Sequence, residues 1–313
     1  QHPRITPGVS RLAVIGEDPG TEETETGTPF CGTPGRFLKA ILGSNGVACD
    51  QLFFGNVCQH QPPRNELSFL PWDSPEITDG IRQLEEDLRV FRPSCVLLLG
   101  RAPFRWARPD LCHEGKKGYH VPLVDWRGSV YLGGGVLAGV KCVATFHPSY
   151  ILRAYTDAPL FKFDVARAVR HSRSTDWTPV TRNKILRPSL QEVLDYLRSF
   201  TEGHGLLTWD IEGYADDVGI TMLSIAKSPI DVLVLPFYID GSNYWSLEDE
   251  VLVWQALAEV LADPLIPKEC HNGFYELFVS AWRHRLIINN LLHDTMMGHW
   301  ELFPEAGGDP EDS

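Results

Sequence analysis

The first half of the chain alternates short apolar runs with helical stretches, and this order limits the fold more than any other feature of the sequence. Four runs rich in β-forming residues occur at residues 11–17, 52–59, 95–101 and 141–146. Helical periodicity lies between them, near residues 35–42 and most clearly over residues 74–91. Strands separated by helices predict a three-layer α/β/α fold with a four-stranded parallel sheet.

The second half has a different order of elements. Residues 173–188 are polar and interrupted by prolines, which predicts a linker. After a helix near residues 189–199 come three closely spaced strand-like runs, and then a helix, a short strand and another helix that starts at Gly273. This order is typical of ribonuclease-H-like nucleases, so we expect a partial ribonuclease-H-like mixed-sheet α/β domain over residues 189–305. The acidic residues 306–313 predict a disordered tail.

Charge is distributed unevenly between the two halves. Residues 1–173 hold 20 Lys and Arg against 18 Asp and Glu, whereas residues 174–313 hold 8 against 23. A phosphate backbone therefore suits the first half better, because the second would repel it unless cations intervene. No apolar run reaches about 18 residues, so we expect no membrane partner. We find no secretory leader, and seven scattered cysteines without CxxC spacing predict neither a zinc site nor disulfides, so a cytoplasmic location is expected.

Acidic and glycine residues cluster directly after the first predicted strand. Residues 16–20 read Gly-Glu-Asp-Pro-Gly, and residues 27–35 read Gly-Thr-Pro-Phe-Cys-Gly-Thr-Pro-Gly. Binding sites of parallel sheets form at the carboxyl ends of the strands, which is where these carboxylates lie. Taken alone, the same residues also suit a solvated Gly/Pro-rich turn.

Three further motifs follow in order at or beside later strands. Asn56 ends the second strand and precedes a Pro-Pro-Arg-Asn segment at residues 62–65, residues 126–129 read Trp-Arg-Gly-Ser, and residues 147–149 read His-Pro-Ser. With residues 16–35, this ordered set resembles the uracil-DNA glycosylase superfamily, especially its thermostable iron–sulfur branch, over residues 8–172. The resemblance implies a glycosylase-like domain at residues 1–172 whose partner is uracil-containing DNA.

The resemblance also implies the catalytic residues. Asp18 takes the position of the principal acid, which orients water and stabilises the positive charge that develops on the sugar. Glu17 supports it. His147 takes the position of a neutral imidazole that donates a hydrogen bond to the departing base.

Recognition of the base and of the DNA is implied in the same way. Phe30 would stack on the extruded uracil, and Asn56 would read its hydrogen-bonding edge beside Gly16. The candidate DNA contacts are of two kinds: Tyr150, Ile151 and Leu152 for the wedge that fills the vacated base stack, and Arg127 and Arg153 for the phosphates.

No cofactor is expected for the glycosylase chemistry. The iron–sulfur branch holds its cluster with four cysteines, but His60 stands where the third would fall and Cys58 is out of register. We therefore expect no iron–sulfur cluster.

The second half carries a candidate metal motif. Asp210 and Glu212 are two residues apart at a strand end, which places both carboxylates on one face, as binding of divalent metals requires. With Glu276 and Asp294 in later motifs, this pattern resembles the 3′-5′ exonuclease domains of bacterial and phage family-A DNA polymerases. The resemblance implies Mg²⁺ or Mn²⁺ held by Asp210, Glu212 and Glu276.

The resemblance to these exonuclease domains also implies a polymerase domain as partner in a longer product, in a bacterial or phage-infected cell. A third exonuclease motif is absent, so we expect weak metal binding and little or no exonuclease activity.

Two functions of different class remain open. The leading hypothesis is a uracil-DNA glycosylase that hydrolyses the N-glycosidic bond of uracil, linked to an incomplete proofreading-type exonuclease module at the amino end of a phage-like polymerase. The alternative is a catalytically idle glycosylase fold that serves as a DNA-binding or replisome-scaffold module. The presence of Asp18, Glu17 and His147 together favours the enzyme.

Overall fold

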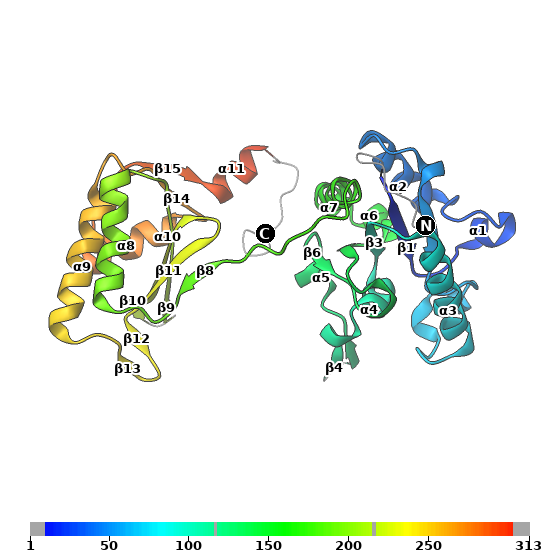
Figure 1. The fold of residues 1–313 in the computed structure, drawn as a ribbon, viewed down its shortest axis with the longest axis horizontal. Helices are drawn as coiled ribbons and strands as arrows, with labels where there is room; N and C mark the ends of the chain where they lie inside the picture. The colour runs from blue at the N-terminus through cyan, green and yellow to red at the C-terminus, as the bar shows by residue number, and fades with distance from the viewer. Residues whose placement is uncertain (1–9, 116–117, 215–216, 303–313) are drawn as a thin grey trace. The chain divides into compact units, whose positions relative to one another are not determined.

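The computed structural model of the protein describes residues 10–115, 118–214 and 217–302. The chain divides into two compact units, and the division falls between Trp177 and Thr178. Each unit contains its own sheet (Figure 1). No helix in the described part of the chain is long and apolar enough to cross a membrane.

The first unit contains a five-stranded sheet in the order β2-β1-β3-β7-β6. Its strands are β1 (Leu12–Gly16), β2 (Phe53–Asn56), β3 (Cys95–Leu99), β6 (Val130–Leu132) and β7 (Lys141–Thr145). The first three and β7 run parallel, as the sequence predicts, whereas β6 pairs antiparallel with β7. The prediction of a four-stranded sheet is therefore wrong, because the sheet has a fifth strand, β6, at one edge. With only three residues, β6 is too short for alternation to reveal it.

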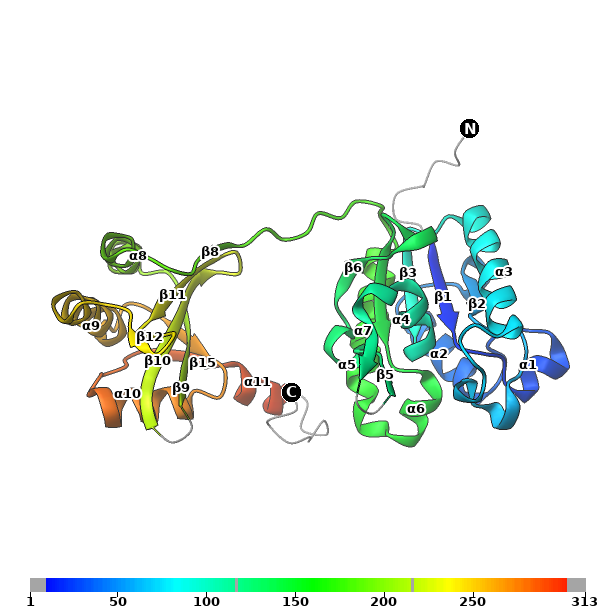
Figure 2. The same ribbon diagram turned by 90° about the horizontal axis from the view of Figure 1, so that it is seen from below.

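Helices cover both faces of this sheet. On one face lie α2 (Thr33–Ser44), α6 (Pro148–Arg153) and α7 (Ala158–His171), and on the other lie α3 (Pro75–Phe91) and α4 (Arg101–Ala107). Strand β1 shows why: Val14 packs in the first core cluster with Phe161, and Ile15 packs in the second with Leu84. A strand buried on both faces reads as a continuous apolar run, which is what β1 and β3 show. Figure 2 shows β1, β2 and β3 with α3 beside them.

Smaller elements complete the first unit. They are α1 (Thr21–Thr26), α5 (Leu123–Trp126) and a hairpin of β4 (His113–Gly115) and β5 (Gly118–His120).

The second unit contains a six-stranded mixed sheet in the order β15-β14-β9-β10-β11-β8. Its strands are β8 (Asn183–Ile185), β9 (Leu207–Tyr214), β10 (Asp217–Ser228), β11 (Asp231–Pro236), β14 (Lys268–Cys270) and β15 (Leu291–Asp294). Strands β9, β10 and β11 are antiparallel neighbours, and the other pairs are parallel. A small hairpin joins β12 (Tyr238–Ile239) to β13 (Ser242–Asn243).

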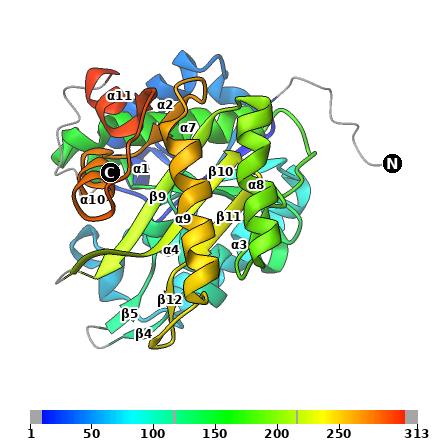
Figure 3. The ribbon, with the colours of Figure 1, turned by 90° about the vertical axis from the view of Figure 1, so that its left-hand side faces the viewer.

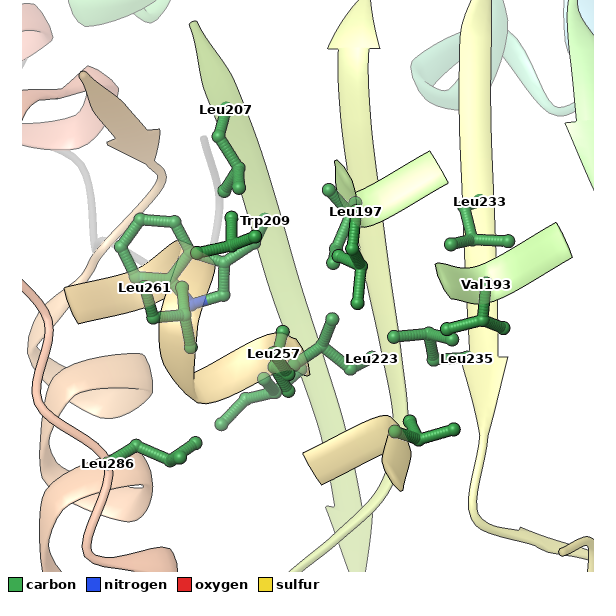
Figure 4. Close-up of a cluster of buried hydrophobic side chains, with 14 of the residues drawn as sticks. Val193, Leu197, Leu207, Trp209, Leu223, Leu233, Leu235, Leu257, Leu261 and Leu286 are labelled. Atoms are coloured by element: carbon green, nitrogen blue, oxygen red, sulfur yellow. The ribbon is translucent and has the colours of Figure 1, made fainter. Parts of the chain in front are cut away.

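Two long helices cover one face of the second sheet. In Figure 3, α8 (Leu190–Gly203) and α9 (Leu247–Ala262) lie side by side across β9, β10 and β11. Figure 4 shows their inward side chains, among them Leu197 and Leu257, packed against Leu223 and Trp209 of the strands. Ser189 caps α8 through a reciprocal hydrogen-bond pair with Glu192, which fixes where that helix starts. Helices α10 (Phe274–His284) and α11 (Thr295–Leu302) follow.

One predicted boundary differs from the structure. Residues 183–185, expected in a linker, form β8, which pairs with β11. The Asn183 side chain donates a hydrogen bond to Asp231 at 3.1 Å. Strand β8 has only three residues, mostly polar, and pairs with one neighbouring strand. Its sequence therefore has the same polar character as a linker. The tail predicted at residues 306–313 lies outside the described residues.

Candidate active site

The carboxyl ends of three parallel strands meet around one cavity of the first unit. Glu17 and Asp18 follow β1, Asn56 ends β2, and His147 follows β7. These residues line a cavity of about 330 Å³. The structure thus brings together residues that are up to about 130 positions apart in the sequence, at the edge where α/β sheets form their sites.

Phe30 and Asn56 line one part of the cavity, and Gly16 packs against both side chains. A Cβ atom on Gly16 would lie 2.5 Å from Oδ1 of Asn56 and 2.9 Å from Cζ of Phe30, so only glycine fits between these two side chains. The Phe30 ring is buried and lies 5.3 Å from the ring of Phe54. Within the described part of the chain, no protein group forms a hydrogen bond with the Asn56 side-chain amide. That amide is therefore available to a ligand.

Glu17 is fixed by the start of α4. Its Oε1 accepts hydrogen bonds from the backbone N–H of Arg101 at 2.8 Å and of Ala102 at 3.2 Å. Gly100 makes this approach possible, because its φ is +97° and a Cβ atom there would lie 2.5 Å from the same oxygen. These two hydrogen bonds fix the position of the Glu17 carboxylate at the N-terminus of α4.

Asp18 lies next to this fixed charge. Burial raises the pKa of Asp18, the negative charge of Glu17 raises it further, and together they bring it to about 7. The two neighbouring carboxylates therefore differ in behaviour: one is anchored, and the other changes its charge near neutral pH.

His147 caps α6 with its own ring. Its Nδ1 accepts the backbone N–H of Ser149 at 3.3 Å and lies 2.7 Å from the Ser149 hydroxyl. Burial lowers the pKa of His147, although the charge of Glu17 acts in the opposite direction. A neutral ring whose Nδ1 accepts must carry its proton on Nε2, so we infer that Nε2 is a hydrogen-bond donor.

The predicted DNA contacts divide into exposed and buried side chains. Tyr150, Leu152 and Arg153 are exposed at α6, with the Tyr150 hydroxyl donating to Asp157 at 2.8 Å. Ile151 is 0% exposed and packs in the core beneath α6. Its prediction as a wedge is wrong, since the side chain faces the sheet.

The Arg127 side chain is also paired within the protein. Its Nε and Nη2 donate to the two oxygens of Asp164, both at 3.1 Å, and Asp164 also accepts from Thr145 at 2.7 Å. Asp164 is buried, and burial raises its pKa against the opposing effect of these donors. Arg127 therefore joins the loop before β6 to α7, and the prediction that it contacts phosphate is wrong.

The carboxylates of the second unit do not form a closed metal centre. Asp210 and Glu212 are exposed on β9, whereas Glu276 on α10 is 4% exposed and its Oε2 has no hydrogen-bond partner. Burial raises the pKa of Glu276 to about 7, helped by the charges of Asp210 and Asp294. Burial and the charge of Glu212 raise the pKa of Asp210.

No group of three or more His, Cys, Asp or Glu residues within residues 10–115, 118–214 and 217–302 is arranged to hold a metal ion. The residues where an iron–sulfur cluster would be expected do not fit one. Cys58 is fully buried, and its thiol donates to the carbonyl of His60 at 3.2 Å.

The sequence did not reveal residues 100–102, which hold Glu17. The signal was available, because this glycine and the two residues after it follow β3 at the same edge of the sheet as the other strand ends.

Comparison with known proteins gives a family match. Residues 2–169 match the family model described as the uracil DNA glycosylase superfamily. A type-4 uracil-DNA glycosylase from Thermotoga maritima is 31% identical over 144 residues, which cover 46% of this chain and 67% of that protein. One from Archaeoglobus fulgidus is 30% identical over 153 residues, which cover 47% of this chain and 71% of that protein.

Solved structures give a weaker match. An EXD2 exonuclease domain soaked in Mg and GMP is 16% identical with a TM-score of 0.28, covering 39% of this chain and 59% of that one. The POL domain of Pol1 from M. smegmatis is 22% identical with a TM-score of 0.29, covering 38% of this chain and 19% of that one. This chain thus spans less than two thirds of either structure, and TM-scores this low carry no argument about fold or function.

Proposed function

Because this chain belongs to the uracil DNA glycosylase superfamily, we propose that its first unit is a uracil-DNA glycosylase that hydrolyses the N-glycosidic bond of uracil in DNA. The observation that carries the proposal is the cavity in which Asp18, Asn56 and His147 meet behind Phe30. It combines a carboxylate, an unpaired amide, an imidazole donor and a buried aromatic ring. A flipped base requires this combination for stacking, edge recognition and bond cleavage.

In the proposed reaction, uracil enters the cavity between Phe30 and Asn56. As the bond from the sugar C1′ to uracil N1 breaks, its electron pair leaves with uracil and positive charge develops on the sugar. The Asp18 carboxylate stabilises that charge and accepts a proton from the water that adds to C1′. Asp18 then releases this proton to solvent, and the uracil anion takes up a proton from solvent, so the products are free uracil and an abasic sugar and the carboxylate is restored.

His147 stabilises the opposite charge. Its Nε2–H donates a hydrogen bond to a carbonyl oxygen of the departing uracil anion. A ring that burial keeps neutral supplies this donor without transferring a full proton. Fixed by Ser149, it needs no reorganisation when the charge develops.

The test is chromatographic measurement of free uracil released by the wild type and by Asp18→Asn. We expect release by the wild type and a reduction of about 10²–10⁴-fold in the variant, the usual contribution of a positioned acid or base. Equal release by both proteins would refute the assignment of Asp18. Absence of release by the wild type, with DNA binding retained, would favour the idle scaffold.

For the second unit we propose an incomplete exonuclease-type module with a low-affinity divalent-cation site. Two observations support it: Asp210 and Glu212 share one face of β9, and the buried Oε2 of Glu276 has no partner. Mg²⁺ is the hard cation that carboxylate oxygens bind. Calorimetric titration with Mg²⁺ should give millimolar or weaker binding that is lost in Asp210→Asn; identical heats from both proteins would contradict the site.

A further inference from the structure

A second, larger hollow opens beside the candidate active site. It has a volume of about 1220 Å³ and lies between the loop after β2, the start of α4 and the end of α6. Glu17, Asp18, Asn65 and Ser149 line both this hollow and the smaller cavity, so the two are continuous. A ligand in the small cavity can therefore extend into the larger one.

Four arginines line this hollow: Arg64, Arg101, Arg105 and Arg153. We call it the arginine groove. None of the four forms an ion pair within the described part of the chain. Elsewhere in the described part of the same unit, Arg36, Arg82, Arg89, Arg108 and Arg127 pair with carboxylates. Other arginines of the unit, such as Arg167 and Arg170, also form no ion pair there but do not line the groove, so it is the clustering of the four that sets the groove apart. Unpaired arginines gathered on one groove are the electrostatic footprint of a polyanion site.

Neighbouring side chains hold one of the groove arginines in place. The Cζ atom of Arg105 lies over two aromatic rings, 4.3 Å from the centre of Trp72 and 3.7 Å from the centre of Tyr119. These two cation–π contacts orient the guanidinium without a carboxylate partner.

Backbone strain marks the loop that carries Arg64. Arg64 and Asn65 both adopt left-handed conformations, with φ of 58° and 57°. Two consecutive non-glycine residues in this region cost about 1 kcal/mol or more each, and such strain concentrates at functional sites. The side chain of Gln61 supports this turn, because its Nε2 donates to Asn65 at 3.1 Å and to Thr21 at 3.0 Å.

The position of the groove indicates its ligand. The acids that line it include Glu17 and Asp18, which would repel a phosphate backbone brought to the small cavity. Cations beside them offset this repulsion where the strand continues. Arg153 is close enough to His147 for its charge to act on that ring.

We propose that the arginine groove binds the phosphates of the single strand that flanks the excised nucleotide on one side. The identity of the ligand as DNA rests on the proposed function. The groove extends the proposed DNA site on one side only. Affinity for DNA should therefore grow with strand length on that side of the uracil and not on the other.

The experiment compares two double variants. Arg64→Gln with Arg101→Gln removes two groove cations, while the Arg101 backbone N–H still holds Glu17. The matched control is Arg82→Gln with Arg89→Gln, which makes the same charge change at exposed, paired positions of α3. Binding of fluorescein-labelled, uracil-free single-stranded oligonucleotides is measured by anisotropy over a range of salt concentrations.

We expect the groove variant to bind more weakly and its log K against log salt plot to be shallower by about 1.4, from about 0.7 per phosphate contact on single strands. The control should match the wild type. Equal slopes for the groove and control variants would overturn the proposal. This readout needs no base release, so failure of the glycosylase assignment can be told apart from failure of the groove.

A length series then tests the one-sided extension. Uracil oligonucleotides lengthened stepwise on the 5′ or the 3′ side are compared by kcat/KM. Wild type should gain on one side, and the groove variant should lose that gain. Equal gains on both sides, or a gain that the variant retains, would contradict the groove.

Discussion

The pH dependence of base release follows directly from the environment of Asp18. Burial, helped by the charge of Glu17, places the pKa of Asp18 at about 7, and the proposed reaction needs the ionised form. With a pKa near 7, about 1% of Asp18 is ionised at pH 5 and about 90% at pH 8, so kcat/KM should fall about 100-fold between pH 8 and pH 5. His147 adds no loss at the basic end, because burial lowers its pKa and keeps the ring neutral there.

Single-turnover uracil release from one oligonucleotide, measured from pH 5 to pH 9 at constant ionic strength, checks this profile. The Asp18→Asn variant should be slow and should lack the acidic limb. The Glu17→Gln variant should keep the limb but move it to lower pH, because burial of Asp18 remains while the neighbouring charge is gone. Gln can still accept the N–H groups of α4 through its carbonyl oxygen. A wild-type profile that is flat from pH 5 to pH 8, or a limb that survives in Asp18→Asn, would refute the reasoning.

Four further changes have defined outcomes. Asn56→Ala should lower kcat/KM about 10–100-fold, as loss of one or two buried hydrogen bonds does, with unchanged affinity for uracil-free DNA; equal kcat/KM would contradict edge recognition. Gly16→Ala should lower both kcat/KM in the same assay and the Tm, because its Cβ would lie less than 3 Å from two buried side chains, those of Asn56 and Phe30; unaltered kinetics would show that the cavity relaxes freely. Arg127→Ala should destabilise the protein to urea by about 3–5 kcal/mol, because it leaves the buried Asp164 uncompensated, and should leave the salt dependence of DNA binding unchanged; a shallower salt slope would restore its phosphate role. Asp18→Asn should raise stability at pH 8 by about 1 kcal/mol after allowing for solvent. A folded-state pKa above the unfolded value favours folding at low pH, and this contribution is lost as pH rises through about 7; equal Tm values at pH 8 would contradict that burial cost.

The sequence predicted those parts of the fold that depend on local pattern. The four predicted strands are present and parallel, and β1 and β3 are the plainest because each is a run of five buried residues. Strands β6 and β8 were missed because three residues carry no periodicity and their pairing partners lie outside the segment. The ordered motifs placed Asp18, Asn56 and His147 at strand ends, and topology brings such ends together.

The pairing and burial of individual side chains could not be predicted from the sequence. Nothing near Arg127 indicates that it binds Asp164, 37 residues later, rather than phosphate. Ile151 lies in a helix of six residues, too short for the pattern to reveal which side faces the core. The four arginines of the groove come from three separate segments, the loop after β2, α4 and α6, so they could not be grouped before the chain was folded.

The most direct test of the central claim is position-resolved base release by the full chain from an end-labelled oligonucleotide with a single uracil. EDTA is present throughout, because it silences a metal-dependent nuclease and spares a glycosylase that needs no metal. An otherwise identical oligonucleotide with thymine serves as control. We predict alkali-sensitive cleavage at the uracil position alone and none in the thymine control. Intact uracil strands after prolonged incubation, with DNA still bound, would contradict the account.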